Sequence, residues 1–389
     1  MTDRKPPVPN QATPSSPDES PSGMRRGLTS YGDAGFSLFL RKAFIKGAGY
    51  TDDALSRPVI GITDTASGYN PCHGNMPQLI EAVQRGILLA GGLPVRFPTI
   101  SVHESFAYPT SMYLRNLMAI DTEEMIRAQP MDAVVLIGGC DKTVPAQLMG
   151  AASADIPAIS LVTGSMLTGS HRGQTVGACT DCRRYWARYR AEEIDDQEIA
   201  AVNDQLVPSV GTCSVMGTAS TMACVVEALG MSVPGAATPP AVTADRLRAA
   251  ELTGAQAVRL AASRVTPRQI LTEDAFHNAF RVLLSIGGST NGIVHLAGQV
   301  PDIDYKSITE QTNNILTRID KLLAEAGVDK TRLISANIWL TDAKHFTELN
   351  AAWEAWVPAG HAPTRACVQS GLMRPGIDVE IAVTALAQA

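Results

Sequence analysis

The fold of this protein is indicated by one stretch, DAVVLIGGCDKTVPAQLMGAASADIPAISLVTG, which covers residues 132–164. It contains two short apolar runs, at 132–139 and 156–164, and a helical pattern at 145–154 between them. Short apolar runs closed by glycine or polar residues are typical of buried parallel strands, and a helix is the usual connection between two such strands. The stretch therefore predicts a strand–helix–strand unit in which Cys140 follows the first strand directly.

The same alternation is found on the N-terminal side of this unit. Apolar runs occur at 57–65 and 93–101, and helical patterns at 76–92 and 121–129. Helical patterns then dominate from about residue 183 to residue 286. Alternating strands and helices predict a layered α/β/α domain with a mainly parallel sheet, in which the carboxyl ends of the strands carry the site.

The two ends of the chain differ from this central part. Residues 1–32 are rich in Pro and Ser and poor in large apolar side chains. Such a segment cannot bury enough surface to offset the entropy of ordering it, so we predict a disordered tail. Strand and helix patterns alternate again at 298–389, which predicts a small α+β unit. The expected domains are therefore 1–32, 33–297 and 298–389.

Composition excludes several classes of protein. A length of 389 residues is typical of two or three domains. Lys and Arg number 32 against 38 Asp and Glu, so the net charge of −6 gives no basic excess for binding nucleic acid. No apolar run approaches the roughly 18–20 residues of a membrane span, and the N-terminus lacks an apolar signal core. We therefore expect a cytoplasmic protein with neither a nucleic acid nor a membrane as its partner.

Three of the seven cysteines lie in loops of one kind, at an expected strand end or helix start. Glycines flank them, in NPCHGN (70–75), GGCDK (138–142) and GTCSVMGT (211–218). Glycine allows the backbone to approach a bulky ligand, and a helix N-terminus stabilises a thiolate. Three separated thiolates are compatible with an iron–sulfur cluster that keeps one open iron. By spacing alone, small apolar residues in the core remain the alternative for these cysteines, and that interpretation suits Cys224.

Long motifs around these loops closely resemble the dihydroxy-acid and sugar-acid dehydratase family (IlvD/Edd), nearer to its sugar-acid branch. They occur in the right order over roughly residues 33–297: GITDTASGYNPCHGNMPQLIEAVQRGILLAGGLP, FPTISVHES, VVLIGGCDKTVPAQLMGAASADIPAI, GTCSVMGTASTMACVVEALGM and IGGSTN. The resemblance implies that Cys72, Cys140 and Cys213 hold an iron–sulfur cluster, for which we favour 2Fe–2S over 4Fe–4S.

The resemblance also implies a magnesium site. Glu104 of HES and Asp141 of CDK are its expected ligands, and Lys142 is the expected carbamylated lysine that completes the oxygen shell. Magnesium prefers carboxylate oxygens, and a carbamate replaces a cation by one more hard oxygen ligand. Without the family pattern, Asp141 and Lys142 would be an exposed ion pair of little energetic value.

The reaction implied by the resemblance is the dehydration of a 2,3-dihydroxy carboxylate, such as an aldonate, to a 2-keto-3-deoxy acid. Mg²⁺ would bind the substrate carboxylate and 2-hydroxyl, and the open iron would take the departing 3-hydroxyl. We therefore expect a hydro-lyase that acts on a small sugar acid or dihydroxy acid, and a homo-oligomer. His73, His103 and His171 lie near these motifs, and we expect each to support the site from outside or to lie on the surface rather than to be catalytic. The family pattern stops at about 292–297, so the β-barrel domain that follows in the family is expected to be absent.

Residues 294–389 resemble a second family, the Rid (YjgF/RidA) enamine/imine deaminases, in motifs that include PTRACVQ and VEIAVTA. This resemblance implies that Arg365 binds the carboxylate of a 2-imino acid and that Glu380 positions the hydrolytic water. A guanidinium suits a carboxylate, although an ion-pairing surface arginine is the alternative. The two patterns meet at 293–298, so we also consider an imine deaminase carried by the C-terminal unit, or an inactive chimeric remnant.

Overall fold

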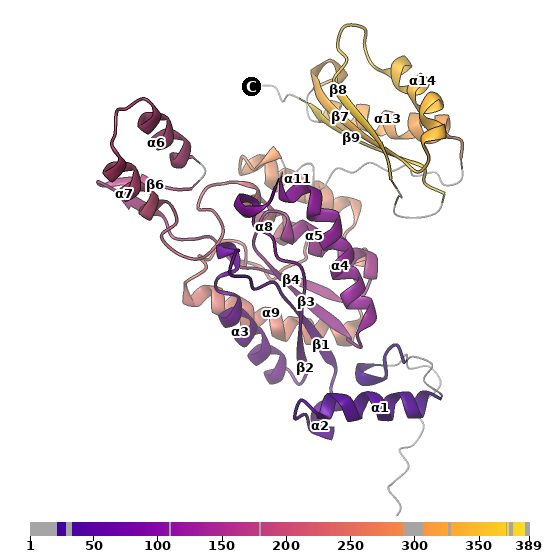
Figure 1. Ribbon diagram of the computed structural model, residues 1–389. Helices are drawn as coiled ribbons and strands as arrows, with labels where there is room; N and C mark the ends of the chain where they lie inside the picture. The colour runs from indigo at the N-terminus through magenta and orange to yellow at the C-terminus, as the bar shows by residue number, and fades with distance from the viewer. Residues whose placement is uncertain are drawn as a thin grey trace, which may run out of the picture. The chain divides into compact units, whose positions relative to one another are not determined.

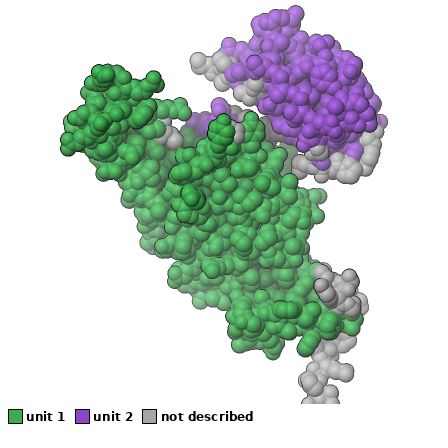
Figure 2. Space-filling model, viewed as in Figure 1, with its two compact units in different colours: residues 1–282 green, residues 283–389 purple. Residues whose placement is uncertain are grey.

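The computed structural model describes residues 22–28, 33–108, 110–178, 180–290, 292, 306–325, 328–370, 372 and 376–385. The chain divides into two compact units, Met1–Val282 and Leu283–Ala389 (Figure 2). Each unit has its own sheet and its own hydrophobic core. The predicted meeting point of the two sequence patterns, 293–298, lies outside the described residues.

Unit 1 is built on a parallel four-stranded sheet in the order β2-β1-β3-β4 (Figure 1). The strands are β1 (Val59–Asp64), β2 (Leu93–Pro98), β3 (Ala133–Gly138) and β4 (Ala158–Val162). Every residue of β3 and β4 is buried, as expected for continuous apolar runs covered on both faces.

Helices cover both faces of this sheet (Figure 1). On one face lie α3 (Met76–Leu89) and α9 (Ala244–Ser263), whose apolar side chains share a core with alternate residues of the strands. On the other face lie α4 (Arg115–Ala128) and α5 (Thr143–Ala154). The predicted α/β/α fold with a parallel sheet is confirmed.

Two glycines allow α3 and α9 to approach closely. A Cβ atom at Gly86 would lie 2.0 Å from the carbonyl oxygen of Glu251, and one at Gly254 would lie 2.2 Å from that of Val83. Both contacts are with backbone, so a larger residue at either position would force the helices apart.

The remaining described elements of unit 1 surround this framework. They are η1 (Gly23–Arg25), α1 (Ala34–Lys46), α2 (Asp52–Leu55), η2 (Pro71–His73), η3 (Glu104–Phe106), η4 (Ser111–Leu114), β5 (Gly169–His171), β6 (Gln174–Val176), α6 (Asp181–Arg190), α7 (Asp196–Leu206), α8 (Thr218–Ala228), α10 (Pro267–Ile270) and α11 (Glu273–Ser285), which runs past the end of the unit. Among the helices that the structure describes, none has both the length and the apolar character needed to cross a membrane.

Part of the segment predicted as a tail is packed on unit 1. The backbone N–H of Gly23 donates to both carboxylate oxygens of Asp132, at 2.9 and 2.8 Å, and Met24 is buried. Asp132 also accepts from the N–H of Val59, at 2.8 Å. Gly23 is thus attached to the sheet domain by a buried carboxylate that is 109 positions away in the chain.

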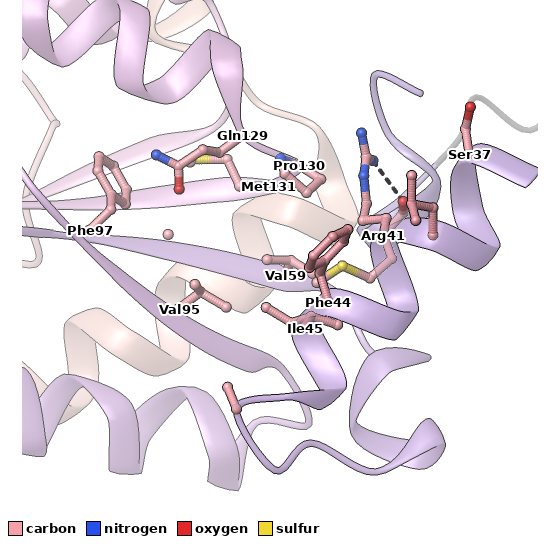
Figure 3. Close-up of a pocket in the computed structure, with 14 residues that line it drawn as sticks. Ser37, Arg41, Phe44, Ile45, Val59, Val95, Phe97, Gln129, Pro130 and Met131 are labelled. Atoms are coloured by element: carbon pink, nitrogen blue, oxygen red, sulfur yellow. Dashed lines mark hydrogen bonds between the residues drawn. The ribbon is translucent and has the colours of Figure 1, made fainter. Parts of the chain in front are cut away.

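A cavity of about 580 Å³ lies between α1 and the strands β1 and β2 (Figure 3). Among the described residues that line it, Arg41 alone is ionisable, and the others are mostly apolar. The Arg41 guanidinium donates to the carbonyl oxygens of Met24, Arg26 and Gly27 at 2.7–2.9 Å, and burial lowers its pKa. The described lining of this cavity therefore offers no carboxylate, imidazole or thiol.

Unit 2 contains a three-stranded sheet in the order β8-β7-β9. The strand β7 (Leu333–Leu340) is parallel to β8 (Thr364–Gln369) and antiparallel to β9 (Val379–Ala385). The helices α13 (Ile308–Glu325) and α14 (Phe346–Trp356) share a core with it. Two further short turns of helix are η5 (Lys330–Arg332) and η6 (Ala343–His345). The predicted small α+β unit is confirmed.

Candidate active site

The cysteine and carboxylate motifs of unit 1 follow the carboxyl ends of neighbouring parallel strands. Cys72 follows β1, Glu104 follows β2 and Cys140 follows β3. Since these ends meet at one edge of the sheet, strand order alone brings the three loops together. Cys213 belongs to a later loop, which is attached beyond the end of β4 by a parallel bridge between Ser165 and Thr212.

Hydrogen bonds connect the Cys213 loop to the Cys72 loop. The N–H of Gly211 donates to the carbonyl oxygen of Pro71 at 3.1 Å. Thr163, which follows β4, donates its hydroxyl to the carbonyl oxygen of Cys72 at 2.8 Å and is fully buried. Gly139 contacts the same threonine, since a Cβ atom there would lie 1.8 Å from its Oγ1. The loop positions are thus set by backbone and buried polar contacts.

His73, expected to support the site or to lie on the surface, is buried and connects the Cys72 loop to the Cys140 loop, a connection that the sequence did not predict. Its Nε2 accepts from the backbone N–H groups of Gly139 and Cys140, at 2.9 and 3.1 Å. Burial lowers the pKa of His73 to about 4, although its hydrogen bond with the carbonyl oxygen of Thr65 opposes this shift. The only signal in the sequence is that a histidine follows a cysteine in a glycine-rich loop.

The three thiols interact with one another. Cys72 and Cys140 are both buried. The pKa of Cys72 is raised by a hydrogen bond with the thiol of Cys140, by burial, and by the charges of Cys140, Cys213 and Asp141. The structure therefore brings the three predicted cluster ligands together.

No group of three or more His, Cys, Asp or Glu side chains among the described residues converges as the ligands of a single metal ion. An iron–sulfur cluster contains several iron and sulfide atoms, so its thiolates are held apart by the cluster and do not converge on one point. The donor set fits such a group: it consists of three thiols in glycine-rich loops, of which Cys140 is hydrogen-bonded to Cys72 and Cys213 acts on Cys72 through its charge.

The predicted magnesium ligands form an ionic cluster beside Cys140. The Nζ of Lys142 lies 2.5 Å from the Oδ2 of Asp141 and 3.8 Å from the Oε2 of Glu104. The side chain of Lys142 is only 4% exposed, whereas that of Glu104 is 45% exposed. The Sγ of Cys140 lies 3.5 Å from the Oδ1 of Asp141. Two carboxylates thus face a buried cationic position next to the thiols.

Glu104 is held in place by two hydroxyl groups. Thr110 donates to its Oε1 at 2.7 Å, and the hydroxyl and N–H of Ser111 donate to its Oε2, the latter at 3.0 Å. Partial burial raises the pKa of Glu104, but these hydrogen bonds and the charge of Lys142 outweigh it and hold the pKa below its usual range. The carboxylate is therefore ionised and oriented, as a metal ligand must be.

In unit 2, Arg365 packs against α14. Its guanidinium carbon lies 5.8 Å from the ring centre of Phe346 and 5.5 Å from that of Trp353. Its Nη2 donates to the Oδ1 of Asn350 at 2.6 Å, whereas its buried Nη1 has no hydrogen-bond partner among the described residues. One end of the guanidinium thus keeps an unused donor.

Arg365 and Glu380 lie on opposite faces of the unit 2 sheet. Arg365 is in register with Ala336, and Glu380 is in register with Trp339. Neighbours across a sheet share a face, whereas residues three apart along one strand point to opposite faces. The two residues that the Rid resemblance assigns to one reaction are therefore not brought together within a single unit.

Two family models match the chain. The model described as dihydroxy-acid/6-phosphogluconate dehydratase N-terminal matches residues 57–326. The model described as endoribonuclease L-PSP matches residues 278–387, so the two matches overlap.

Individual dehydratases are also similar to this chain. The chain is 43% identical to L-arabinonate dehydratase of Rhizobium leguminosarum bv. trifolii, over 69% of this chain and 47% of that protein. It is 38% identical to dihydroxy-acid dehydratase of Moorella thermoacetica, over 74% of this chain and 53% of that protein. The chain thus spans about half the length of the curated relatives it matches.

The C-terminal part matches a solved structure of a YjgF protein family member from Neisseria meningitidis. The identity is 43%, and the match covers 24% of this chain and 77% of that one, with a TM-score of 0.23. The family model supports the Rid resemblance of this segment. With its first family model matched over 57–326, the chain belongs to the dihydroxy-acid/6-phosphogluconate dehydratase family.

Proposed function

We propose that this chain is a hydro-lyase that dehydrates a sugar acid to a 2-keto-3-deoxy acid. In this proposal Cys72, Cys140 and Cys213 hold an iron–sulfur cluster of the 2Fe–2S type. The observation that carries the proposal is that Cys140 lies beside both Cys72 and Asp141, with Cys213 and Glu104 at the same edge of the sheet.

The oxygen cluster is the proposed Mg²⁺ site. Lys142 is buried between two carboxylates, in a position that suits a cation, so a carbamate on its Nζ would let a divalent ion take the place of the ammonium. When bound, Mg²⁺ and the cluster would supply Lewis-acid stabilisation for negative charge on the substrate oxygens. Ser111 and Thr110 would orient Glu104 for this purpose.

The names of the relatives support the substrate class. They include enzymes named for L-arabinonate and for 6-deoxy-6-sulfo-D-gluconate, which are aldonates, as well as enzymes named for dihydroxy acids. Both classes are small hydroxylated carboxylates. We extend the proposal to a cytoplasmic location, because a reducing compartment preserves thiolate ligands. We also propose that the protein is a homo-oligomer.

Anaerobic purification with iron and sulfide analysis tests this proposal. We expect brown protein with stoichiometric iron, and 2-keto acid from at least one member of a panel of aldonates in the presence of Mg²⁺. Protein that stays colourless after anaerobic reconstitution would contradict the cluster. Loaded protein that yields no keto acid from any aldonate or dihydroxy acid would contradict the hydro-lyase activity of this chain.

A second candidate function, imine hydrolysis by unit 2, is favoured by the unused Nη1 donor of Arg365. A carboxylate that accepts from a guanidinium gains roughly 1.5–3 kcal/mol, so we expect Arg365→Ala to reduce 2-imino acid hydrolysis about 10- to 100-fold. The measurement is capture of residual imine by semicarbazide. Arg365→Lys is the matched control, since lysine keeps the positive charge but lacks the two parallel donors of the guanidinium. We expect its rate of imine hydrolysis to lie between those of the wild type and of Arg365→Ala. Equal rates in all three proteins would rule out this role.

A further inference from the structure

His73 joins the two loops that carry Cys72 and Cys140. It follows Cys72 directly, is 1% exposed, and accepts through one ring nitrogen from the backbone N–H groups of Gly139 and Cys140. We infer that His73 is a positioning residue, which sets the position of the Cys140 thiol relative to the Cys72 thiol. Its importance for cluster binding rests on the function proposed above.

The hydrogen bonds of His73 define its tautomer. Nε2 accepts from two N–H groups and so cannot carry a proton. The proton is therefore on Nδ1, which lies 3.0 Å from the carbonyl oxygen of Thr65 and can donate to it. The neutral ring thus spans from the end of β1, where Thr65 lies, to the loop after β3. It acts as a rigid connection of fixed length between these two segments.

This connection acts on the thiols themselves. One of the two N–H groups belongs to Cys140 and the other to the residue before it, so His73 orients the two successive peptide units that lead to the Cys140 Cα. At the other end of the connection, Cys72 is the chain neighbour of His73 and its thiol contacts that of Cys140. Without an acceptor at this point, the buried N–H groups would turn toward another partner and the Cys140 side chain would turn with them.

Two variants separate this role from a general contribution to stability. In His73→Gln the side-chain oxygen can replace Nε2 as the acceptor. In His73→Asn the shorter amide can replace the Nδ1–H donor to Thr65 but leaves Gly139 and Cys140 without an acceptor. Both variants keep a polar amide in the same buried place and each loses one side of the connection, so each serves as the control for the other.

The first measurement is made on metal-free protein and does not depend on any cofactor. Diamide oxidises two neighbouring thiols to a disulfide, and the rate of Cys72–Cys140 pairing, followed by peptide mass analysis, reports their mutual position. We expect the Gln variant to pair at nearly the wild-type rate and the Asn variant to pair roughly 10-fold more slowly, because the N–H groups that position Cys140 lose their hydrogen-bond acceptor. Equal pairing rates in the Asn variant and the wild type would overturn the inference.

The second measurement is iron affinity after anaerobic reconstitution, by competition with a chelator, together with the visible circular dichroism of the cluster. We expect the Asn variant to lose about 10- to 100-fold in affinity, with an altered spectrum, and the Gln variant to resemble the wild type. If no protein binds iron but the pairing rates differ as expected, the proposed cluster fails and the positioning role stands. If the loaded Asn and wild-type proteins have the same affinity and spectrum, the positioning role for the cluster fails.

Discussion

Replacing Cys140 by serine is expected to reduce bound iron and sulfide to background and to abolish formation of keto acid. Cys140 is the thiol in contact with Cys72, and its Sγ is 3.5 Å from Asp141, so it links the thiols to the oxygen cluster. A serine hydroxyl is neutral at pH 7 and is a harder, weaker ligand than a thiolate, so two soft ligands would remain where three are needed. Iron and sulfide per chain, visible absorption and aldonate turnover measure the effect.

Cys224→Ser is the matched control for this prediction. Cys224 is a half-buried cysteine of α8, and its pKa is raised by burial and by the charge of Glu227. A raised pKa keeps the thiol protonated, as in an unreactive cysteine with a structural role. We expect this variant to keep the iron and the colour of the wild type. Retention of stoichiometric iron by the Cys140 variant, or its loss from the Cys224 variant, would show that the cluster ligands are misassigned.

Replacing Gly139 by alanine is expected to destabilise unit 1 and to prevent cofactor loading. The new Cβ would lie 1.8 Å from the Oγ1 of Thr163 and 3.1 Å from the carbonyl oxygen of Cys72. Thr163 would have to move, and its 2.8 Å hydrogen bond to Cys72 would break. Overpacking and the loss of a buried hydrogen bond together cost about 3 kcal/mol or more, which lowers the unfolding midpoint of a unit this size by roughly 6–12 °C.

Gly68→Ala is the control for the glycine prediction. Gly68 lies in the loop that leads to Cys72, and a Cβ there would meet nothing within 4 Å. Differential scanning calorimetry of the metal-free proteins measures the midpoints, and iron analysis measures loading. We expect the Gly68 variant to match the wild type in both. A Gly139 variant with wild-type stability would mean that the cysteine loops do not pack as closely as described.

The layered fold could be predicted from the sequence because strand and helix patterns are local. The apolar runs around Cys140 match β3 and β4 within a residue or two, and the helical pattern between them matches most of α5. A parallel sheet also implied that the loops after β1, β2 and β3 would lie at one edge, and these three strands are neighbours in the observed sheet. The packing of residues 22–28 could not be predicted, because it depends on Asp132, which is close only in the folded chain.

Within the candidate site, the sequence determined which side chains are available: three thiols, two carboxylates and a lysine in glycine-rich loops. Only the tertiary structure decided how they are held. The N–H of Ser111 donates to Glu104, and the N–H of Cys140 donates to His73. Strand and helix patterns in the sequence do not predict these hydrogen bonds. In unit 2, strand register likewise decided that Arg365 and Glu380 face opposite ways. Residue chemistry is a property of the chain, whereas distance and facing direction follow from pairing between distant segments, which only the folded structure specifies.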